Sequence, residues 1–294
     1  MKPTSPVLST LLLGAALGCA LPAHATVYAS YSGSQLGVTQ RTDALVQTNY
    51  FGTGVQARGL ALGANNDLYI AAGNHLINYS TSGTLIHDMA FPISSINYTD
   101  VDVGGGHVVA SYNGSQQGFT VRDYALNQSN AVSTGFDISG IAAGDNNHVY
   151  LASGNHLYDY LTNGTQVTNM TFPDLGINYT DVAYGNNLLV ASYAGSQHGV
   201  TLRNLALNQT SYFGVGFDID RLTLGTNNDV FLTSGNNIYD YSLTGTLLNH
   251  MTFPDSDIRY TGIDAMAPVP EPDTVAMLLA GLGLVGWIAR RRKA

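Results

Sequence analysis

The sequence predicts an all-β protein, and three observations lead to that prediction. Only 11% of the residues are charged, while Gly is abundant at 33 residues. Residues 26–268 contain no Lys, Glu or Cys, so this region lacks the side chains that usually cover exposed helix faces. Short apolar runs alternate there with Gly and Asn at a regular spacing, which is typical of β-strands joined by tight turns.

The charge of residues 26–268 excludes one class of partner. The region has 18 Asp and six Arg, which is a formal charge of −12. Because nucleic acids are recognised through basic patches, we expect no nucleic acid partner. The chain is also 45% hydrophobic, which is too much for a disordered acidic segment, so we expect a folded domain.

Residues 1–25 are predicted to be a signal peptide. A lysine precedes the apolar run 7–20, which we expect to form the signal helix, and Ala23 and Ala25 frame an A-x-A cleavage site. We therefore expect export, with cleavage by signal peptidase after Ala25. Cys19 leaves a lipoprotein as an alternative, but the residues before it do not match a lipobox. The cleaved chain would contain no cysteine, and therefore no disulfide or thiol chemistry.

Residues 268–294 form a second targeting segment. The apolar stretch 274–289 is expected to be a transmembrane helix, and its fifteen apolar residues would span about 22 Å. This is shorter than the hydrocarbon core of a bilayer, which is about 30 Å thick, and a short permanent anchor is one interpretation. The basic tail 290–293 would stay on the cytoplasmic side. The residues that flank the stretch are Pro270, Glu271 and Pro272 before it and Arg290, Arg291, Arg292 and Lys293 after it.

The order of these parts resembles the PEP-CTERM sorting signal of Gram-negative bacteria. The V-P-E-P motif, the apolar stretch and the Arg-rich tail follow one another over about 25 residues, as in that signal. The resemblance implies transient anchoring in the inner membrane, cleavage by an exosortase near residues 270–272, and delivery to the cell envelope or the extracellular space. Proteins with this signal accompany exopolysaccharide and biofilm production, which makes a polysaccharide an expected partner.

Between these segments, residues 26–267 are predicted to be one domain of three tandem repeats. The motif A-S-Y-x-G-S-Q-x-G begins at Ala29, Ala110 and Ala191. Both steps are 81 residues, and other segments of the region return at the same interval. A constant interval indicates a repeat architecture in which each unit packs against its neighbours.

Each 81-residue repeat contains two versions of one unit of about 40 residues. In one of them, strands are predicted at 98–103, 108–112, 119–125 and near 131–134. Four short strands in about 40 residues are typical of a β-propeller blade. A solenoid is the alternative, but its coils are usually about 20 to 30 residues long. The sequence therefore predicts a six-bladed β-propeller of three double-blade repeats.

The ends of the domain predict how the ring closes. Residues 27–30 match the second strand of a blade, and residues 260–264 match the first strand. One blade would then combine strands from both ends, which covers two sheet edges and holds the ring shut. The runs 67–86 and 147–167 are similar to blades of the NHL and related six-bladed families, and this similarity implies the same ring.

Loops between the second and third strands of alternate blades provide a candidate ligand face. Each loop carries a Ser-Gln pair, and a Tyr leads into the first strand of the same blade. Neutral hydrogen-bonding groups beside an aromatic ring suit a hydroxylated ligand such as a sugar. The alternative is that one tight turn is built three times, with Gly present for conformational reasons. The candidate residues are Ser34, Gln35, Ser115, Gln116, Ser196, Gln197, Tyr98, Tyr179 and Tyr260.

The charged residues are expected to be structural. Arg41, Arg122 and Arg203 occur once per repeat, and the abundance of Asp predicts an ion pair for each. Asp100 and Asp102 are the strongest acidic pair, whose oxygens suit calcium, but no EF-hand-like spacing is present. The histidines lack the spacing of a zinc site, so we predict no metal and no cofactor, with bound calcium as the alternative.

Two classes of function remain. The first is a non-catalytic surface or matrix propeller that binds exopolysaccharide, and the second is a propeller hydrolase or lactonase acting on an extracellular carbohydrate or ester. A catalytic site should break the symmetry of the ring, and the copies are nearly equivalent. Gluconolactonase-type and sialidase-type propellers use Glu, which residues 26–268 lack, and no G-x-S-x-G motif is present. We therefore expect a binding or structural protein rather than an enzyme.

The two targeting segments predict a mature chain that runs from Thr26 to about Pro270. Intact-mass analysis of the protein isolated from its host should give the mass of that species, because both segments are removed. A species that retains the tail 290–293 would contradict the sorting prediction and favour a permanent anchor.

Overall fold

The computed structural model describes residues 26–266, which lie within one compact unit of the chain. The expected signal helix, the V-P-E-P motif and the apolar stretch 274–289 lie outside the described residues. In the described part of the chain, no helix is long and apolar enough to cross a membrane.

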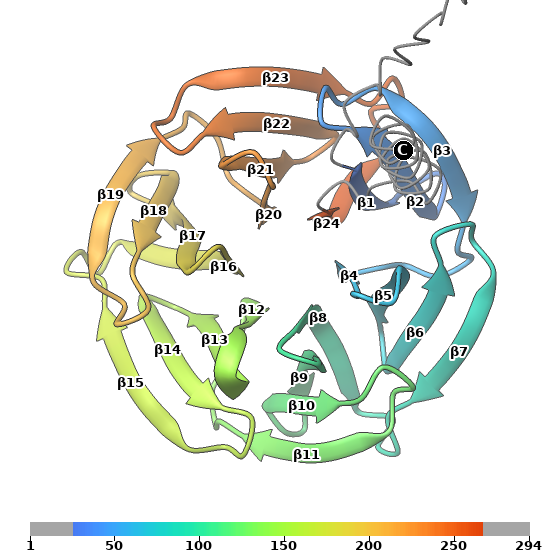
Figure 1. Cartoon of the computed structure of the whole chain (residues 1–294), viewed down its shortest axis with the longest axis horizontal. Helices are drawn as coiled ribbons and strands as arrows, with labels where there is room; N and C mark the ends of the chain where they lie inside the picture. The colour runs from blue at the N-terminus through green and yellow to red at the C-terminus, as the bar shows by residue number, and fades with distance from the viewer. Residues whose placement is uncertain (1–25, 267–294) are drawn as a thin grey trace, which may run out of the picture. The chain divides into compact units, whose positions relative to one another are not determined.

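Six antiparallel sheets of four strands each surround a central axis (Figure 1). The prediction of an all-β, six-bladed propeller is therefore confirmed. Blade 1 comprises β24 (Arg259–Met266), β1 (Thr26–Ser32), β2 (Gly37–Thr42) and β3 (Gln47–Gly52); blade 2 comprises β4 (Gly59–Leu62), β5 (Asp67–Ala72), β6 (His75–Ser80) and β7 (Leu85–Ala90); blade 3 comprises β8 (Ile96–Gly104), β9 (His107–Gly114), β10 (Gly118–Arg122) and β11 (Gln128–Ser133). Blade 4 comprises β12 (Gly140–Ala143), β13 (His148–Ser153), β14 (His156–Leu161) and β15 (Gln166–Thr171); blade 5 comprises β16 (Ile177–Gly185), β17 (Leu188–Gly195), β18 (Gly199–Arg203) and β19 (Gln209–Gly214); blade 6 comprises β20 (Arg221–Leu224), β21 (Asp229–Ser234), β22 (Asn237–Ser242) and β23 (Leu247–Thr252). A short 3-10 turn, η1 (Asp145–Asn147), precedes β13.

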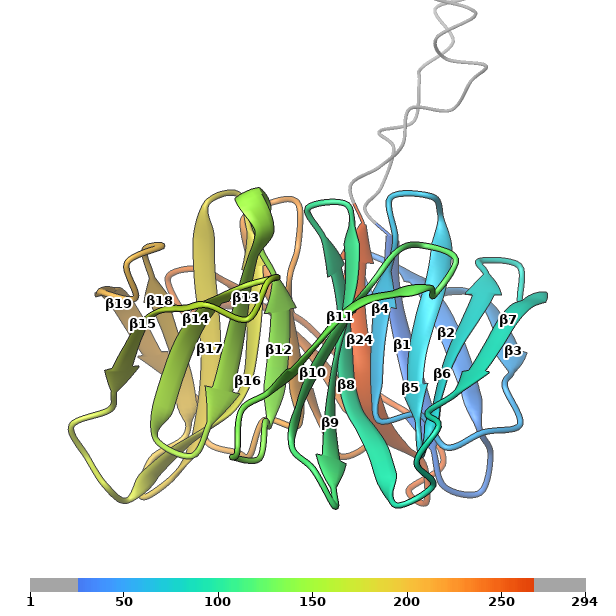
Figure 2. The same cartoon turned by 90° about the horizontal axis from the view of Figure 1, so that it is seen from below.

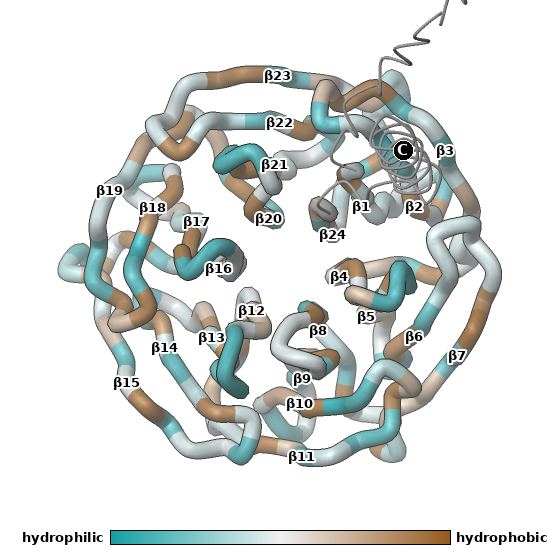
Figure 3. Tube along the Cα trace, viewed as in Figure 1, coloured by the Kyte–Doolittle hydropathy of each residue, from teal (hydrophilic) through white to brown (hydrophobic). Residues whose placement is uncertain are grey.

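The core lies between neighbouring blades. Innermost strands such as β4 and β12 are buried along their whole length, because each blade is covered by a blade on either side. One core cluster, for example, joins Ala61 and Tyr69 of blade 2 to Tyr98 and Val101 of blade 3. The outermost strands β3 and β7 are mostly exposed. Hydrophobic residues are nevertheless present on the outermost strands, as Figure 3 shows for β7.

β10 ends earlier than the sequence predicted. The strand was expected to run over 119–125, whereas it ends at Arg122. The Asp123 side chain accepts hydrogen bonds from the backbone N–H groups of Ala125 (3.0 Å) and Asn127 (2.8 Å), and Leu126 has a left-handed φ of 64°. These bonds make a turn into β11, so the local preference of Asp overrides the apolar pattern.

The ring closes through a sheet made from both ends of the domain, as predicted. β24 pairs with β1, and Val27 lies opposite Ala265, Ala29 opposite Ile263, and Tyr31 opposite Tyr260. The two remaining pairings of blade 1, β1 with β2 and β2 with β3, complete the order β24-β1-β2-β3. Strands at opposite ends of the domain therefore form one sheet.

The ring has two distinct faces (Figure 2). The turn face carries the turns between the first and second strands of the blades, such as that between β8 and β9, and the turns between the third and fourth strands. The loop face carries the loops between second and third strands, which include residues 33–36, 115–117 and 196–198, together with the connections between blades. Thr26 pairs with Met266 at the end of β1 that is distant from the loop 33–36, so the chain enters and leaves the ring on the turn face.

A chain truncated after Asp257 should lose stability throughout the ring, because β1 loses its partner and blade 1 its innermost strand. Tyr260 and Ile263 of β24 are buried, so we expect the melting temperature to fall by about 10 °C or more. Circular dichroism during heating measures this. A chain that ends at Ala265 is the matched control and should melt close to the parent; equal melting of both truncations would contradict closure through β24.

Candidate functional site

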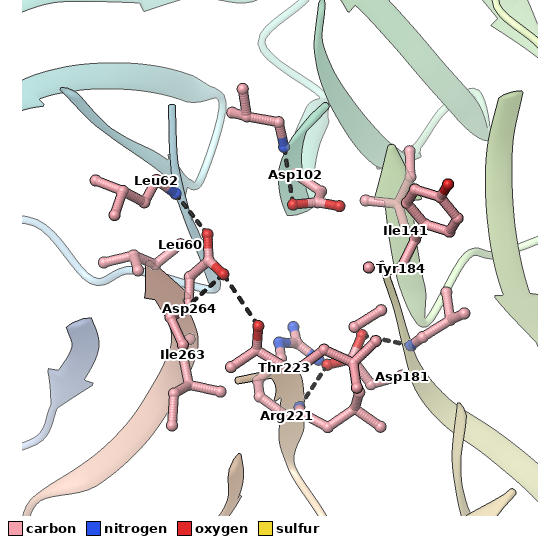
Figure 4. Close-up of a pocket in the computed structure, with 18 of the residues that line it drawn as sticks. Leu60, Leu62, Asp102, Ile141, Asp181, Tyr184, Arg221, Thr223, Ile263 and Asp264 are labelled. Carbon is pink, nitrogen blue, oxygen red and sulfur yellow. Dashed lines mark hydrogen bonds between the residues drawn. The ribbon is translucent and has the colours of Figure 1, made fainter. Parts of the chain in front are cut away.

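Four aspartates converge on the channel that runs along the axis of the ring, and Figure 4 labels three of them, Asp102, Asp181 and Asp264. β8 contributes Asp100 and Asp102, β16 contributes Asp181, and β24 contributes Asp264. They line a cavity of about 400 Å³ together with apolar side chains of the innermost strands. The cavity includes residues 184–186 and 224–226 at the turns after β16 and β20, which places it toward the turn face.

Each carboxylate joins its own strand to the innermost strand of the next blade. Asp181 accepts hydrogen bonds from the backbone N–H groups of Val182 and Leu222, both at 2.9 Å. Asp264 accepts one from Leu62 in blade 2 at 2.7 Å. Asp100 and Asp102 bind the N–H groups of Ile141 and Ala143 in blade 4 at 3.3 and 2.8 Å. These aspartates therefore satisfy backbone donors that point into the channel.

Burial changes the protonation of these carboxyls. It raises the pKa of Asp181 to about 8; the nearby Asp100 raises this pKa further, and Arg221 opposes the increase. Burial also raises the pKa of Asp264 to about 6, although backbone hydrogen bonds counteract it. The pKa of Asp102 is well above its usual range because of burial and the neighbouring Asp264. The channel therefore holds fewer negative charges at neutral pH than its four aspartates suggest.

Arg221 crosses the channel and closes the cavity on the side of the loop face. Its Nε and Nη2 donate to the carbonyl oxygen of Arg58 at 3.1 and 2.6 Å, and Nη2 also donates to that of Thr99 at 3.1 Å. Nη1 donates to the carbonyl oxygens of Ser139 at 3.4 Å and Asp220 at 3.1 Å. All five N–H groups of the guanidinium thus bind backbone carbonyls, in the region of blades 2, 3, 4 and 6.

Arg221 fits into the channel because two positions differ together in the third repeat. Positions 59, 140 and 221 are 81 residues apart and hold Gly, Gly and Arg, while positions 100, 181 and 262 hold Asp, Asp and Gly. A Cβ atom at Gly59 or Gly140 would collide with the aspartate of the next blade. In the third repeat the aspartate is replaced by Gly262, and this leaves room for Arg221. The sequence prediction of nearly equivalent copies missed this asymmetry, which a comparison of the repeats in steps of 81 residues reveals.

A second pocket, of about 520 Å³, lies on the other side of Arg221 and opens toward the loop face. Its walls come from the starts of innermost strands and the connections that precede them. Two further arginines, Arg58 and Arg259, line this pocket with Asp220. None of these three residues was among the candidates chosen from the sequence.

The glutamines and serines of the candidate ligand face lie on the loop face and are exposed. Gln35, Gln116 and Gln197 form no side-chain hydrogen bond with any residue that the structure describes. The serines instead hold their loops in place. Ser34 donates to Asp255 at 2.6 Å, Ser196 donates to Asp174 at 3.1 Å, and Ser115 is 2.8 Å from the hydroxyl of Ser95.

The tyrosines of the candidate face lie inside the blades instead. Tyr98, Tyr179 and Tyr260 are at most 1% exposed, so they cannot contact a ligand on the loop face. Their hydroxyls accept hydrogen bonds from the once-per-repeat arginines, for example from Arg203 to Tyr179 at 2.7 Å and from Arg122 to Tyr98 at 3.0 Å. The prediction that these tyrosines contact a ligand is therefore wrong. The alternation of residues along a strand shows where the strand starts, but it does not show whether that start is buried between blades or exposed on the loop face.

The partners of the once-per-repeat arginines also differ from the prediction. Arg122 donates to the carbonyl oxygen of Leu126 at 2.8 Å and to the Gln128 side chain at 2.8 Å, in addition to Tyr98. Arg41 and Arg203 make the corresponding bonds to Leu45 and Leu207. Among the described residues, bonds to neutral acceptors take the place of the expected ion pairs with Asp. The turn supplies the carbonyl and the bulged start of the next strand supplies the Gln side chain that bind the buried guanidinium. Over residues 26–266, no group of three or more His, Cys, Asp or Glu residues has an arrangement suited to a metal ion.

The raised carboxyl pKa values predict that the protein loses stability as pH rises. An unfolded Asp titrates near 3.9, whereas Asp181 titrates at about 8 in the folded protein, so folding favours the protonated form. The unfolding free energy should therefore fall between about pH 4 and pH 8, by about 1.4 kcal/mol per pH unit for a single carboxyl. Urea unfolding across this range measures the slope.

Asp181→Asn should reduce this slope most clearly between pH 6 and 8, where Asp264 no longer contributes strongly. Asp137→Asn, at an exposed aspartate outside the channel, is the control and should leave the slope unchanged. A slope that is the same in Asp181→Asn and the parent would contradict the assignment.

Comparisons with known proteins support the predicted sorting motif at residues 268–293 and the propeller fold of the described residues. Residues 268–293 match the PEP-CTERM protein-sorting motif. No curated protein sequence matches the chain. A protein of unknown function from Bacteroides caccae is similar in structure, with a TM-score of 0.67, 9% identity, and coverage of 83% of this chain and 99% of that protein. The Neurospora crassa Pan2 WD40 domain is similar with a TM-score of 0.53, 11% identity, and coverage of 68% and 67%.

At these identities the likeness to solved structures shows the fold alone. The sorting motif, in contrast, implies export and membrane-associated sorting with processing by an exosortase. The chain is therefore an exported six-bladed β-propeller protein that carries a PEP-CTERM sorting motif.

Proposed function

We propose that this protein is a non-catalytic binding protein for an extracellular polysaccharide, and that the loop face is its binding surface. The observation that carries the proposal is the set of three exposed glutamines, Gln35, Gln116 and Gln197, whose side chains have no partner among the described residues. The amide of Gln both donates and accepts hydrogen bonds, which suits the hydroxyl groups of a sugar.

The direction in which the chain leaves the ring supports the choice of face. β24 ends at Met266 on the turn face, and the sorting motif begins two residues later at position 268. The loop face is the opposite face of the ring, so it is remote from the point at which the anchor is joined.

Threefold repetition supports a polymeric ligand over a small molecule. The three glutamines occupy equivalent loops of blades 1, 3 and 5, so a chain of repeating sugars can contact more than one of them. Linked weak contacts raise the overall affinity without any strong single site. The expected mode is therefore retention of a polymer rather than capture of a monosaccharide.

The bonding in the channel argues for binding over hydrolysis. Both carboxylate oxygens of Asp181 accept hydrogen bonds from backbone N–H groups, and every N–H of the Arg221 guanidinium donates a hydrogen bond to a backbone carbonyl oxygen. A propeller hydrolase or lactonase acting on a carbohydrate or ester would need an available acid and base. Asp181, with its pKa near 8, is the group that such an enzyme would use as acid, so hydrolysis that is lost in Asp181→Asn would favour this second candidate.

Changing Gln35, Gln116 and Gln197 singly to Ala should weaken retention of the full chain on an immobilised polysaccharide slightly. The triple change should abolish retention, because avidity is lost when every contact is weakened. Retention is measured by affinity electrophoresis in gels that contain the host's own exopolysaccharide. The melting temperature should stay near that of the parent, because these side chains bind no other part of the described ring.

A matched control on the turn face is Ser82→Ala, Asn163→Ala and Thr244→Ala in one chain, which removes three exposed polar side chains from the turns between third and fourth strands. This control should be retained like the parent. Unchanged retention of a folded glutamine triple variant would instead assign the loops a purely structural role.

A further inference from the structure

The arginines of the ring divide into two groups with different surroundings. Three of the six in residues 26–266, Arg41, Arg122 and Arg203, are buried in the blades. The other three, Arg58, Arg221 and Arg259, all line the pocket on the loop face. The region has no Lys and a formal charge of −12, so this pocket concentrates its remaining positive charge.

The three arginines of the pocket do not have the same role. Arg221 forms the floor, and its N–H groups are fully used by backbone carbonyls. Its charge is balanced in the channel by Asp100, whose carboxylate is 3.9 Å away. Arg58 and Arg259 are exposed, and neither guanidinium forms a hydrogen bond or ion pair with a residue in the described range. These two side chains are therefore available to a ligand.

Both available arginines depart from the repeat. Position 58 corresponds to Ser139 and Asp220 in the other repeats, and position 259 corresponds to Asn97 and Asn178. The same blade geometry is thus built elsewhere without Arg, so the fold does not require either side chain. Arg259 begins β24 and Arg58 directly precedes β4, which are the innermost strands of the neighbouring blades 1 and 2. The two arginines that differ from the repeat therefore lie on the same side of one pocket.

We propose that this pocket binds the carboxylate of an acidic sugar, such as a uronic acid, within an anionic polysaccharide. Arg58 and Arg259 bind the carboxylate, since a planar guanidinium matches its two oxygens. The pocket also offers hydrogen-bonding groups for ring hydroxyls from Gln56, Asp220 and Thr261. The inference rests on the proposed polysaccharide binding and adds the class of sugar that the loop face selects.

The lining of the pocket favours an acidic sugar over an acidic peptide. Hydroxyl, amide and carboxylate groups surround the two arginines, and a carboxylate such as Asp220 accepts hydrogen bonds from the hydroxyl groups of a sugar, which a poly-acidic peptide lacks. Protonation of the buried aspartates behind Arg221 limits the negative charge near the pocket. The pocket thus suits one carboxylate at a time on a hydroxylated polymer.

The test compares binding of the full chain to polygalacturonate and to the same polymer after methyl esterification, which removes the charge and keeps the sugar. The parent should bind the acidic form at least about tenfold more tightly, and added salt should weaken this binding. This comparison needs no variant, so it decides the inference even if a variant fails to fold. Retardation in gels that contain either polymer gives the dissociation constants.

Variants then assign the preference to the pocket. Arg58→Ser and Arg259→Asn each introduce the residue of an equivalent position, and Arg221 contacts the backbone carbonyl of Arg58 rather than its side chain. Each should weaken binding of the acidic polymer by about threefold, so the double variant loses about tenfold and should bind both polymers equally. The double variant Arg58→Lys and Arg259→Lys keeps the charge and should retain a reduced preference.

Four results would overturn the inference, and the last of them would also overturn the proposed function. Equal binding of both polymers by the parent would leave the proposal of polysaccharide binding intact but would contradict the selection of an acidic sugar. An undiminished preference in the folded double Ser/Asn variant would place the acidic site elsewhere. Competition by poly-L-glutamate as strong as that by polygalacturonate would show that the carboxylate is recognised without its sugar. If the protein binds neither of the two polymers nor the polysaccharide of the host, the proposed function is contradicted together with this inference.

Discussion

The structure depends on satisfying backbone groups at the inner edges of six sheets. Each innermost strand has one side without a neighbouring strand, and these sides face a largely buried channel where unpaired polar groups are costly. Asp100, Asp102, Asp181 and Asp264 accept hydrogen bonds from N–H groups of the next blade, while Arg221 donates to carbonyl groups of several blades. Carboxylates and a guanidinium therefore replace the missing strand. The pairing of β24 with β1 makes this arrangement possible, because it closes the ring around the channel.

The same requirement explains why a threefold sequence produces an asymmetric axis. Three identical copies of the Gly59–Asp100 arrangement would place three carboxylates at one level of the channel without a cation. The exchange to Arg221 and Gly262 in the third repeat supplies that cation and divides the channel into two cavities. The cavity toward the turn face is acidic and internally bonded, whereas the pocket toward the loop face contains two arginines, Arg58 and Arg259, that form no ion pair with a described residue. Arg221, which stabilises the axis through its hydrogen bonds, thus separates two chemically different cavities.

Export and architecture are consistent with one another. A chain without cysteine after residue 25 needs no oxidative folding, and closure through a shared sheet protects both ends of the ring. The sorting motif is joined to the turn face, which leaves the loop face, with its exposed glutamines and arginine pocket, on the far side of the ring. The surface that offers unsatisfied hydrogen-bonding groups is therefore also the surface that is farthest from the attachment point.

The sequence by itself determined the number of blades, the closing blade and the sorting motif, because each depends on a pattern that is local or strictly periodic. Strand alternation, Gly and Asn turns and the 81-residue interval are sufficient for these features. Only the tertiary structure decided which polar residues meet. Tyr98 and Arg122 are 24 residues apart and bind each other inside a blade, while Arg58 and Arg259 are 201 positions apart and line one pocket. The first contact depends on the packing of strands within one blade, and the second depends on ring closure. Burial at the axis, rather than residue type, determines which aspartates keep a proton.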